Sequence, residues 1–360
     1  MNATRRPPVL ITVVVCVGVL MVSGGAVAGS PPAQAASSVC PTSETALATD
    51  ITRAGNGGTV KLSCRSRTTI TFSNPISIGR SVIIDAHSSH GAIALEAYKH
   101  SGLFVVAEHR SLTVNSLTLS DGSAPRGGAI DAYSDTVIVT NCIFSNDSAV
   151  SGNGGAIYSM GGTLAVNSSS FLNDSARGDD GSGRGGAIYS DVGTLSVVRT
   201  TFFNNSASYE SGAIDIERGA LSIADSLFSK NSAGTFEGGA IGNEADEGTV
   251  TNSTFSNNSA SGGGAFYNHL GTLLVENSTF TDNHGSYGGG AIYSDSHILT
   301  IDNSTFSNNS AVSGEGGAIL NEASLAVANS TFSGNSAGYG GAIASYGGSV
   351  NPSEAHLHGD

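Results

Sequence analysis

Residues 289–311 read GGAIYSDSHILTIDNSTFSNNSA, and the same pattern of residues recurs along most of the chain. The opening phrase Gly-Gly-Ala-Ile occurs at residues 127–130, 154–157, 185–188, 238–241, 289–292, 316–319 and 340–343. Variants of the phrase occupy residues 211–214 and 263–266. Successive occurrences are about 26 residues apart, a period typical of solenoid proteins. Because so short a repeat has room for three brief strands but not for a helix pair, the pattern predicts an all-β solenoid.

Each repeat has three segments with the residue pattern of a β-strand. A pair of apolar residues precedes a phenylalanine by seven and five positions, as Leu299 and Ile301 precede Phe306. Apolar residues two apart mark one face of a strand. The phenylalanine lies in the second strand, and the Gly-Gly-Ala-Ile phrase forms the third. Stacked repeats would bury these residues as continuous apolar columns, which no single repeat could do alone.

A polar column accompanies the phenylalanines. The third residue after each Phe is aspartate in two repeats, at Asp147 and Asp174, and asparagine in the later repeats, at Asn205, Asn231, Asn258, Asn283, Asn309 and Asn335. At the spacing of roughly 4.8 Å between paired strands, amide side chains can bond to the neighbours above and below. We therefore predict a structural asparagine ladder that also satisfies the turn backbone.

The composition supports a solenoid and limits the possible partners. The chain has 360 residues, of which 49 are glycine and none is tryptophan. Glycine suits the tight corners that every solenoid turn needs. The formal net charge is -14, which argues against nucleic acids and anionic membranes as partners.

The first 35 residues have the features of an export signal. Arg5 and Arg6 precede an apolar run at residues 9–22, and small residues follow it. The alternative is a membrane anchor, but the run is shorter than the roughly 20 residues that a transmembrane helix needs. We therefore expect a secreted or cell-surface protein with no membrane span after signal cleavage. The remaining chain divides into a cap with irregular first turns (36–110), the repeats (111–346) and a polar tail (347–360).

The region after the signal is expected to cap the solenoid. Residues 43–54 predict a short amphipathic helix with Ser43 as its N-cap. Cys40 and Cys64 flank this segment, and in an oxidising compartment we expect them to form a disulfide that contributes about 3 kcal/mol. Cys142 lies two residues before Phe144, so strand alternation predicts a small buried residue and not a reactive thiol.

The pairing of Gly-Gly-Ala-Ile with Phe-x-x-Asn resembles the repeat of the polymorphic outer-membrane proteins, a family of surface-exposed autotransporter passengers. The resemblance covers residues 111–346, and the earlier strands look like the entry to pectin-lyase-like β-helix proteins. It implies a right-handed parallel β-helix, a cell-surface or secreted location with outer-membrane association, and an adhesin-like, non-enzymatic role. Because no membrane-inserted segment is evident after the signal, we expect release from the cell or retention by a partner.

One column of residues is predicted to provide a binding surface. The residue after the phrase is tyrosine at Tyr158, Tyr189, Tyr267 and Tyr293. Alternation points these side chains outward, and exposed aromatic ladders bind sugar rings or protein surfaces. Cell-surface glycans or proteins are therefore the expected partners. The alternative is that tyrosine is present only because it favours strands.

A group of acidic residues provides the alternative, enzymatic hypothesis. Glu210, Asp215 and Glu217 lie close together in the sequence, next to Arg218. Paired carboxylates carry out glycoside hydrolysis, so a polysaccharide lyase or glycosidase on the same scaffold is the rival interpretation. The simpler interpretation is a solvated face of an acidic protein, and the fold itself supplies no activity. The sequence predicts no catalytic residue, cofactor or metal site that we would name.

Overall fold

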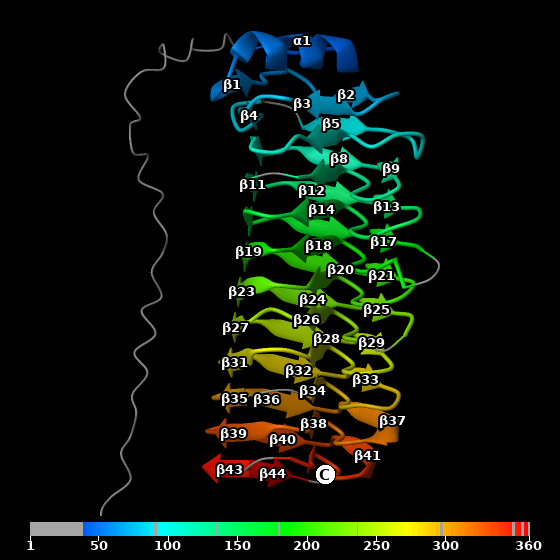
Figure 1. Ribbon diagram of the computed structural model, residues 1–360, viewed down its shortest axis with the longest axis vertical. Coiled ribbons are helices and arrows are strands. Elements are labelled where there is room, and N and C mark those ends of the chain that lie inside the picture. Colours follow the sequence, from blue (N-terminus) through cyan, green and yellow to red (C-terminus); the bar gives the residue numbers. More distant parts are fainter. Residues whose placement is uncertain are drawn as a thin grey trace, which may run out of the picture. The chain divides into compact units, whose positions relative to one another are not determined.

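The computed structural model describes residues 39–89, 92–133, 135–178, 181–235, 237–295, 298–347, 350–353 and 356–358. The predicted signal at residues 1–35 and part of the polar tail lie outside the described residues. Within these ranges the chain forms one short helix, α1 (Glu44–Ala54), followed by strands that pair in parallel (Figure 1). The strands build an all-β parallel solenoid of about 11 turns, which confirms the predicted fold class.

Four parallel sheets run along the solenoid, and each takes one strand from successive turns. The Leu/Val sheet contains β1 (Gly58–Lys61), β4 (Val82–Asp85), β7 (Ser111–Asn115), β11 (Thr136–Thr140), β15 (Thr163–Asn167), β19 (Gly193–Val198), β23 (Gly219–Ala224), β27 (Glu247–Thr251), β31 (Thr272–Glu276), β35 (Ile298–Asp302), β39 (Ser324–Ala328) and β43 (Val350–Ser353). The Phe sheet contains β2 (Thr68–Thr71), β5 (Ile93–Glu96), β8 (Thr118–Ser120), β12 (Ile143–Ser145), β16 (Ser170–Leu172), β20 (Thr201–Phe203), β24 (Leu227–Ser229), β28 (Thr254–Ser256), β32 (Thr279–Thr281), β36 (Thr305–Ser307), β40 (Thr331–Ser333) and β44 (His356–His358). The Ile sheet contains β3 (Ile76–Ile78), β6 (Phe104–Val106), β10 (Ile130–Ala132), β14 (Ile157–Met160), β18 (Ile188–Asp191), β22 (Ile214–Ile216), β26 (Ile241–Asn243), β30 (Phe266–Asn268), β34 (Ile292–Ser294), β38 (Ile319–Asn321) and β42 (Ile343–Ser345). The short sheet contains β9 (Ser123–Ala124), β13 (Ser148–Ala149), β17 (Ser175–Ala176), β21 (Ser206–Ala207), β25 (Ser232–Ala233), β29 (Ser259–Ala260), β33 (His284–Gly285), β37 (Ser310–Glu315) and β41 (Ser336–Tyr339).

The short sheet is a difference from the three strands per repeat that the sequence predicts. It forms where the Ser-Ala pair follows the ladder position. There the Ser175 N–H donates to the Asp147 carbonyl and the Ser206 N–H donates to the Asp174 carbonyl, each at 2.9 Å. Because the ladder holds successive turns in register, the two residues after it continue the same parallel pairing.

The core is built from the predicted apolar columns. The stacked phenylalanines have no exposed surface, and neighbouring ring centroids are 4.6–4.9 Å apart with nearly parallel planes. They are Phe144, Phe171, Phe202, Phe228, Phe255, Phe280, Phe306 and Phe332. The Leu, Val and Ile columns of the other two long sheets pack against them in one continuous cluster. Burial of each column by its neighbours stabilises the turns jointly.

The asparagines form a continuous ladder in the corner after the Phe sheet. The Oδ1 of Asn258 accepts hydrogen bonds from the backbone N–H and the Nδ2 of Asn231, both at 3.0 Å. The Nδ2 of Asn258 also donates to the carbonyl of Phe228, one turn back. This pattern repeats from Asn205 to Asn335, so each amide side chain connects three successive turns.

The first two members of this column are fully buried aspartates. Asp174 Oδ1 accepts from the Asp147 N–H at 2.9 Å, and Asp147 Oδ1 accepts from the Gly122 N–H at 2.7 Å. Oδ2 then occupies the place of the asparagine Nδ2, and neither Oδ2 has a hydrogen-bond partner among the described residues. Burial raises the pKa of both carboxyls well above the usual range.

The first turns carry the cap. Ser43 Oγ accepts from the Ala46 N–H at the start of α1, and Leu47 and Ile51 are buried against the top of the solenoid. Cys40 and Cys64 form a disulfide that closes a 24-residue separation. Cys142 is buried, and burial raises its thiol pKa to about 11, which keeps the thiol protonated.

Candidate functional site

The outer face of the Ile sheet brings two columns of side chains together. One column is the residue after the Ile of each phrase, which strand alternation points outward. The other is the residue immediately before the phrase, in the loop that enters the strand. The Nε of Arg126 lies 3.2 Å from a carboxylate oxygen of Asp131, which shows that the two columns meet. Each turn therefore contributes one loop residue and one strand residue to this face.

The predicted exposed ladder of four tyrosines is wrong for two of its members. Tyr158 and Tyr189 stack with ring centroids 5.2 Å apart, but they are only 7% and 5% exposed. The Arg126 guanidinium lies 5.0 Å from the Tyr158 ring centroid, and Glu217 accepts a hydrogen bond from Tyr189. Side chains from neighbouring loops thus fold over both rings, which strand alternation alone does not reveal.

Tyr267 and Tyr293 remain partly exposed. Their ring centroids are 5.2 Å apart, and the planes are tilted by 38°. The Tyr267 hydroxyl donates to Asp295 at 2.8 Å, and the Tyr293 hydroxyl donates to Glu322 at 3.0 Å. The rings are therefore held in place, and this pair is the part of the predicted aromatic surface that solvent still reaches.

A pocket of about 450 Å³ opens on the same face, beside the buried tyrosine pair. Its walls are Pro125, Arg126, Asp131, Ser151, Gly152, Asn153, Tyr158 and Ser182. The Arg126 guanidinium stacks 4.6 Å from the Tyr133 ring centroid while its Nε binds Asp131. Asn153 Oδ1 accepts from the N–H groups of Gly183 and Arg184 at 3.0 and 3.1 Å. Burial raises the pKa of Asp131, and the charge of Arg126 opposes that shift. These contacts fix the polar side chains of Arg126, Asp131 and Asn153 in the wall of the pocket.

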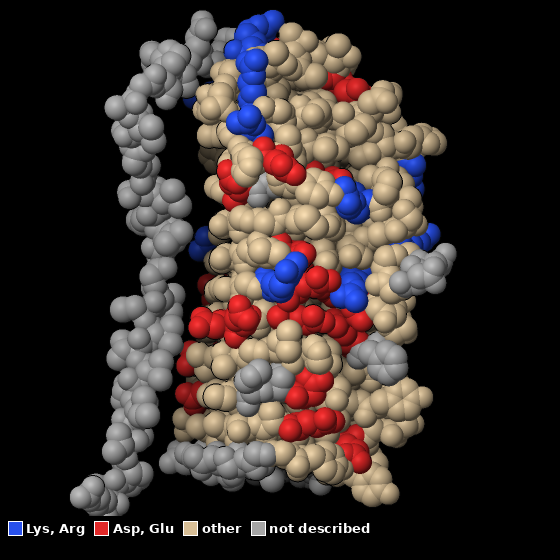
Figure 2. All heavy atoms as spheres, in the orientation of Figure 1, with Lys and Arg blue, Asp and Glu red and all other residues tan. Residues whose placement is uncertain are grey.

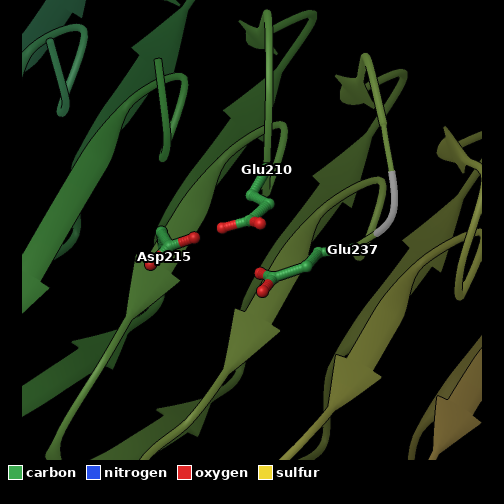
Figure 3. Close-up of side chains that lie close together, drawn as sticks. All are labelled: Glu210, Asp215 and Glu237. Atoms are coloured by element: carbon green, nitrogen blue, oxygen red, sulfur yellow. The ribbon is translucent and has the colours of Figure 1, made fainter. Parts of the chain in front are cut away.

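The acidic group differs from the predicted one by one residue. Glu210 and Asp215 do lie together, but the third carboxylate is Glu237 and not Glu217 (Figure 3). One carboxylate oxygen of each of the three lies within 4.8 Å of those of the others. Glu217 is not one of the three, and it binds Arg184 at 3.1 Å. We call Glu210, Asp215 and Glu237 the acidic triad.

Arg218, the basic residue of the predicted group, is also paired outside the triad. Arg218 binds Asp191 through two hydrogen bonds of 2.9 Å. Glu237 immediately precedes the Gly-Gly-Ala-Ile phrase at residues 238–241. Glu210 holds the equivalent position one turn earlier, so the two side chains lie in the same column. Comparison of that loop position between neighbouring repeats would have identified it in the sequence.

The triad is almost closed to solvent. Glu210, Asp215 and Glu237 are 8%, 2% and 5% exposed. Burial raises the pKa of Asp215 to about 7 against the opposing charge of Arg184, and burial together with the Asp215 charge raises the pKa of Glu237 well above its usual range. Oxygen donors of this kind are suited to a hard cation. A polysaccharide chain has no access to carboxylates so deeply covered.

Acidic side chains are conspicuous on the surface as well. Figure 2 shows that they gather in the middle and lower turns of the displayed face. Within the described residues, no helix has the length and apolar character needed to cross a bilayer.

Comparison with known proteins identifies the scaffold. A family model described as a right-handed beta helix region matches residues 235–355. The matched segment runs from the loop before β26 to the last turn. No curated protein matches the chain.

Proposed function

We propose that this protein is an extracellular β-helix with an adhesin-like, non-enzymatic role, and that it binds sugar residues of cell-surface glycans in the pocket beside Tyr158. The observation that carries the proposal is the pocket itself, with its fixed Arg126–Asp131 pair and the Asn153 side chain in the wall.

The chemistry of the wall matches a sugar. Each hydroxyl of a sugar ring both donates and accepts hydrogen bonds, so recognition needs both kinds of group at fixed positions. Asp131 provides acceptors, whereas Arg126 and the Asn153 amide provide donors. The net charge of -14 favours a neutral ligand over an anionic polysaccharide.

Two further features support an extracellular binding role. Disulfides such as Cys40–Cys64 persist mainly in oxidising compartments, which agrees with the export signal expected at the N-terminus. The repeat phrase resembles that of surface-exposed outer-membrane passengers. We include retention at a bacterial surface in the proposal, and that resemblance is its sole support.

The acidic triad is the natural place to look for the rival enzymatic activity, and its burial argues against that activity. Glycosidases place their two carboxyl groups on either side of a bound sugar ring. The triad side chains are at most 8% exposed, which leaves no open space beside them for a sugar ring.

The test is a binding screen of the purified mature chain against neutral and acidic glycans, with cleavage products assayed in the same samples. Ser151→Phe fills the exposed rim of the pocket. Ser313→Phe is the matched control, because residues 148–157 and 310–319 share the sequence SAVSGxGGAI. We expect Ser151→Phe to weaken glycan binding at least about tenfold and Ser313→Phe to leave it unchanged.

Two results would overturn the proposal. Absence of binding to any glycan by the parent chain would remove the adhesin role. Cleavage of a polysaccharide that Asp215→Asn abolishes would establish the enzyme instead.

A further inference from the structure

The acidic triad is built across two turns. Glu210 lies in the loop before β22, Asp215 lies on β22, and Glu237 lies in the loop before β26. Figure 3 shows the three carboxylates pointing toward one another. Gly242 stands opposite Asp215 on β26, and a Cβ there would lie 2.1 Å from Glu237 Oε2. The missing side chain is therefore what makes room for the Glu237 carboxylate.

The charges of the cluster do not balance. Arg184 is the guanidinium beside the cluster. Its Nε lies 2.8 Å from Glu210 Oε2, and it also binds Glu217, which lies outside the triad. With the triad and Glu217 ionised, the local charge is -3 (four negative and one positive). Like charges held this close in a buried site strongly oppose one another unless a proton or a cation intervenes.

An independent observation points to a missing ligand. Asp215 is 2% exposed, and its Oδ2 has no hydrogen-bond partner among the described residues. Buried carboxylate oxygens are normally paired, so a solitary one on a side chain that faces two other carboxylates lacks its counterpart. Ser211 Oγ, fully buried, adds another oxygen by donating to Glu237 Oε2 at 2.9 Å.

We propose that Glu210, Asp215 and Glu237 bind a single calcium ion that ties the turn of β22 to the turn of β26. The donors are all oxygens, which hard divalent cations prefer and zinc does not. Oxygens bound to one calcium ion at about 2.4 Å are at most about 5 Å apart, whereas those around magnesium are at most about 4 Å apart. The triad oxygens all lie within 4.8 Å of one another, so one calcium ion can contact all three. Calcium accepts several carboxylates in irregular geometry, whereas magnesium demands near-ideal octahedral geometry and usually keeps several waters. The calcium charge of two offsets most of the local charge of the cluster.

The experiment measures calcium uptake by the mature chain after treatment with EDTA and removal of the chelator. Equilibrium dialysis gives the number of calcium ions per chain, and circular dichroism gives the thermal midpoint with and without calcium chloride. Glu237→Gln removes one ligand charge, and Gly242→Ala fills the space beside Glu237 without changing any charge. Glu247→Gln is the control, because Glu247 is an exposed carboxylate on β27.

We expect one tightly bound calcium ion per chain and a higher midpoint in its presence. Glu237→Gln and Gly242→Ala should weaken calcium binding at least about 100-fold, whereas Glu247→Gln should not. The uptake by the parent chain does not depend on whether a variant folds. Absence of a tight site in the parent would overturn the proposal, as would equal binding by Glu237→Gln or an equal response to magnesium chloride.

Discussion

Replacement of Asp147 and Asp174 by asparagine should stabilise the solenoid. In the rest of the ladder, each Nδ2 donates two hydrogen bonds, one to the next Oδ1 and one to a phenylalanine carbonyl. The buried Oδ2 atoms of the two aspartates have no such bonds among the described residues. A net gain of about 0.5–1.5 kcal/mol per hydrogen bond gives about 1–3 kcal/mol for each substitution.

The gain should depend on pH with a defined sign. The folded pKa of both aspartates is raised above the usual 3.8 by burial. A carboxyl group whose pKa is higher in the folded than in the unfolded chain contributes its full stabilisation only below its unfolded-state pKa. This contribution to the free energy of unfolding is lost as the pH rises toward its folded-state pKa. The parent should therefore lose stability between about pH 4 and neutral pH relative to Asp147→Asn/Asp174→Asn, which has no acid at either position.

Urea unfolding from pH 3 to pH 8 measures the difference. Asp282→Asn is the matched control, because Asp282 is exposed in the corner immediately before a ladder residue and has a φ of 55° that asparagine also adopts. A double variant less stable than the parent at neutral pH, or a difference that does not change with pH, would refute the assignment of buried protonated aspartates.

Three other predictions concern stability. Asn258→Leu should cost about 1–3 kcal/mol, because it breaks bonds to two neighbouring turns, whereas Asn74→Leu at an exposed position should cost little; equal urea midpoints would show that the ladder is not structural. Phe255→Ala should cost about 3–5 kcal/mol through a cavity in the stacked column, and calorimetry should show a larger loss than for exposed Phe203→Ala. Reduction of Cys40–Cys64 should lower stability by about 3 kcal/mol, and a Cys64→Ser variant should show no further loss with reductant.

The sequence predicts the interior of this protein well because stacking imposes the same demand on every turn. The apolar pair, the phenylalanine and the ladder residue each return at the same offset, so their partners one turn away are known from the repeat. One further interior column follows the same rule but is not among the columns predicted above. Asn243 is buried on β26 at a position that alternation assigns to the core, and its Nδ2 donates to Asn268 Oδ1 at 2.7 Å. Serine or asparagine occupies this position in most turns, as at Ser190, Asn268 and Asn321, so the repeat contains a second buried polar column.

The outer face is less predictable because it depends on loops of unequal length. Arg184, in the loop before its phrase, binds Glu217, and Glu217 in turn bonds to Tyr189. Strand alternation correctly predicts that the Tyr189 side chain points outward. It contains no information about which loop side chains cover the ring. The prediction of the acidic group is wrong in one member for a related reason. Glu237 comes from the following turn and is distant from Glu210 in the sequence.

The two proposed sites are joined by one residue, and this has a measurable consequence. The Arg184 backbone N–H donates to Asn153 Oδ1 in the pocket wall, while its side chain binds Glu210 of the triad. Calcium held by Glu210 would fix the partner of Arg184 and, through it, the position of Asn153. Asn153 would then lose less conformational freedom when sugar binds, so calcium should increase the affinity for sugar. By thermodynamic reciprocity, sugar should increase the affinity for calcium. Titration of the parent chain with sugar in calcium and in EDTA measures this coupling, and Glu237→Gln should abolish it. Identical sugar affinities under the two conditions would show that Arg184 supports the two sites independently.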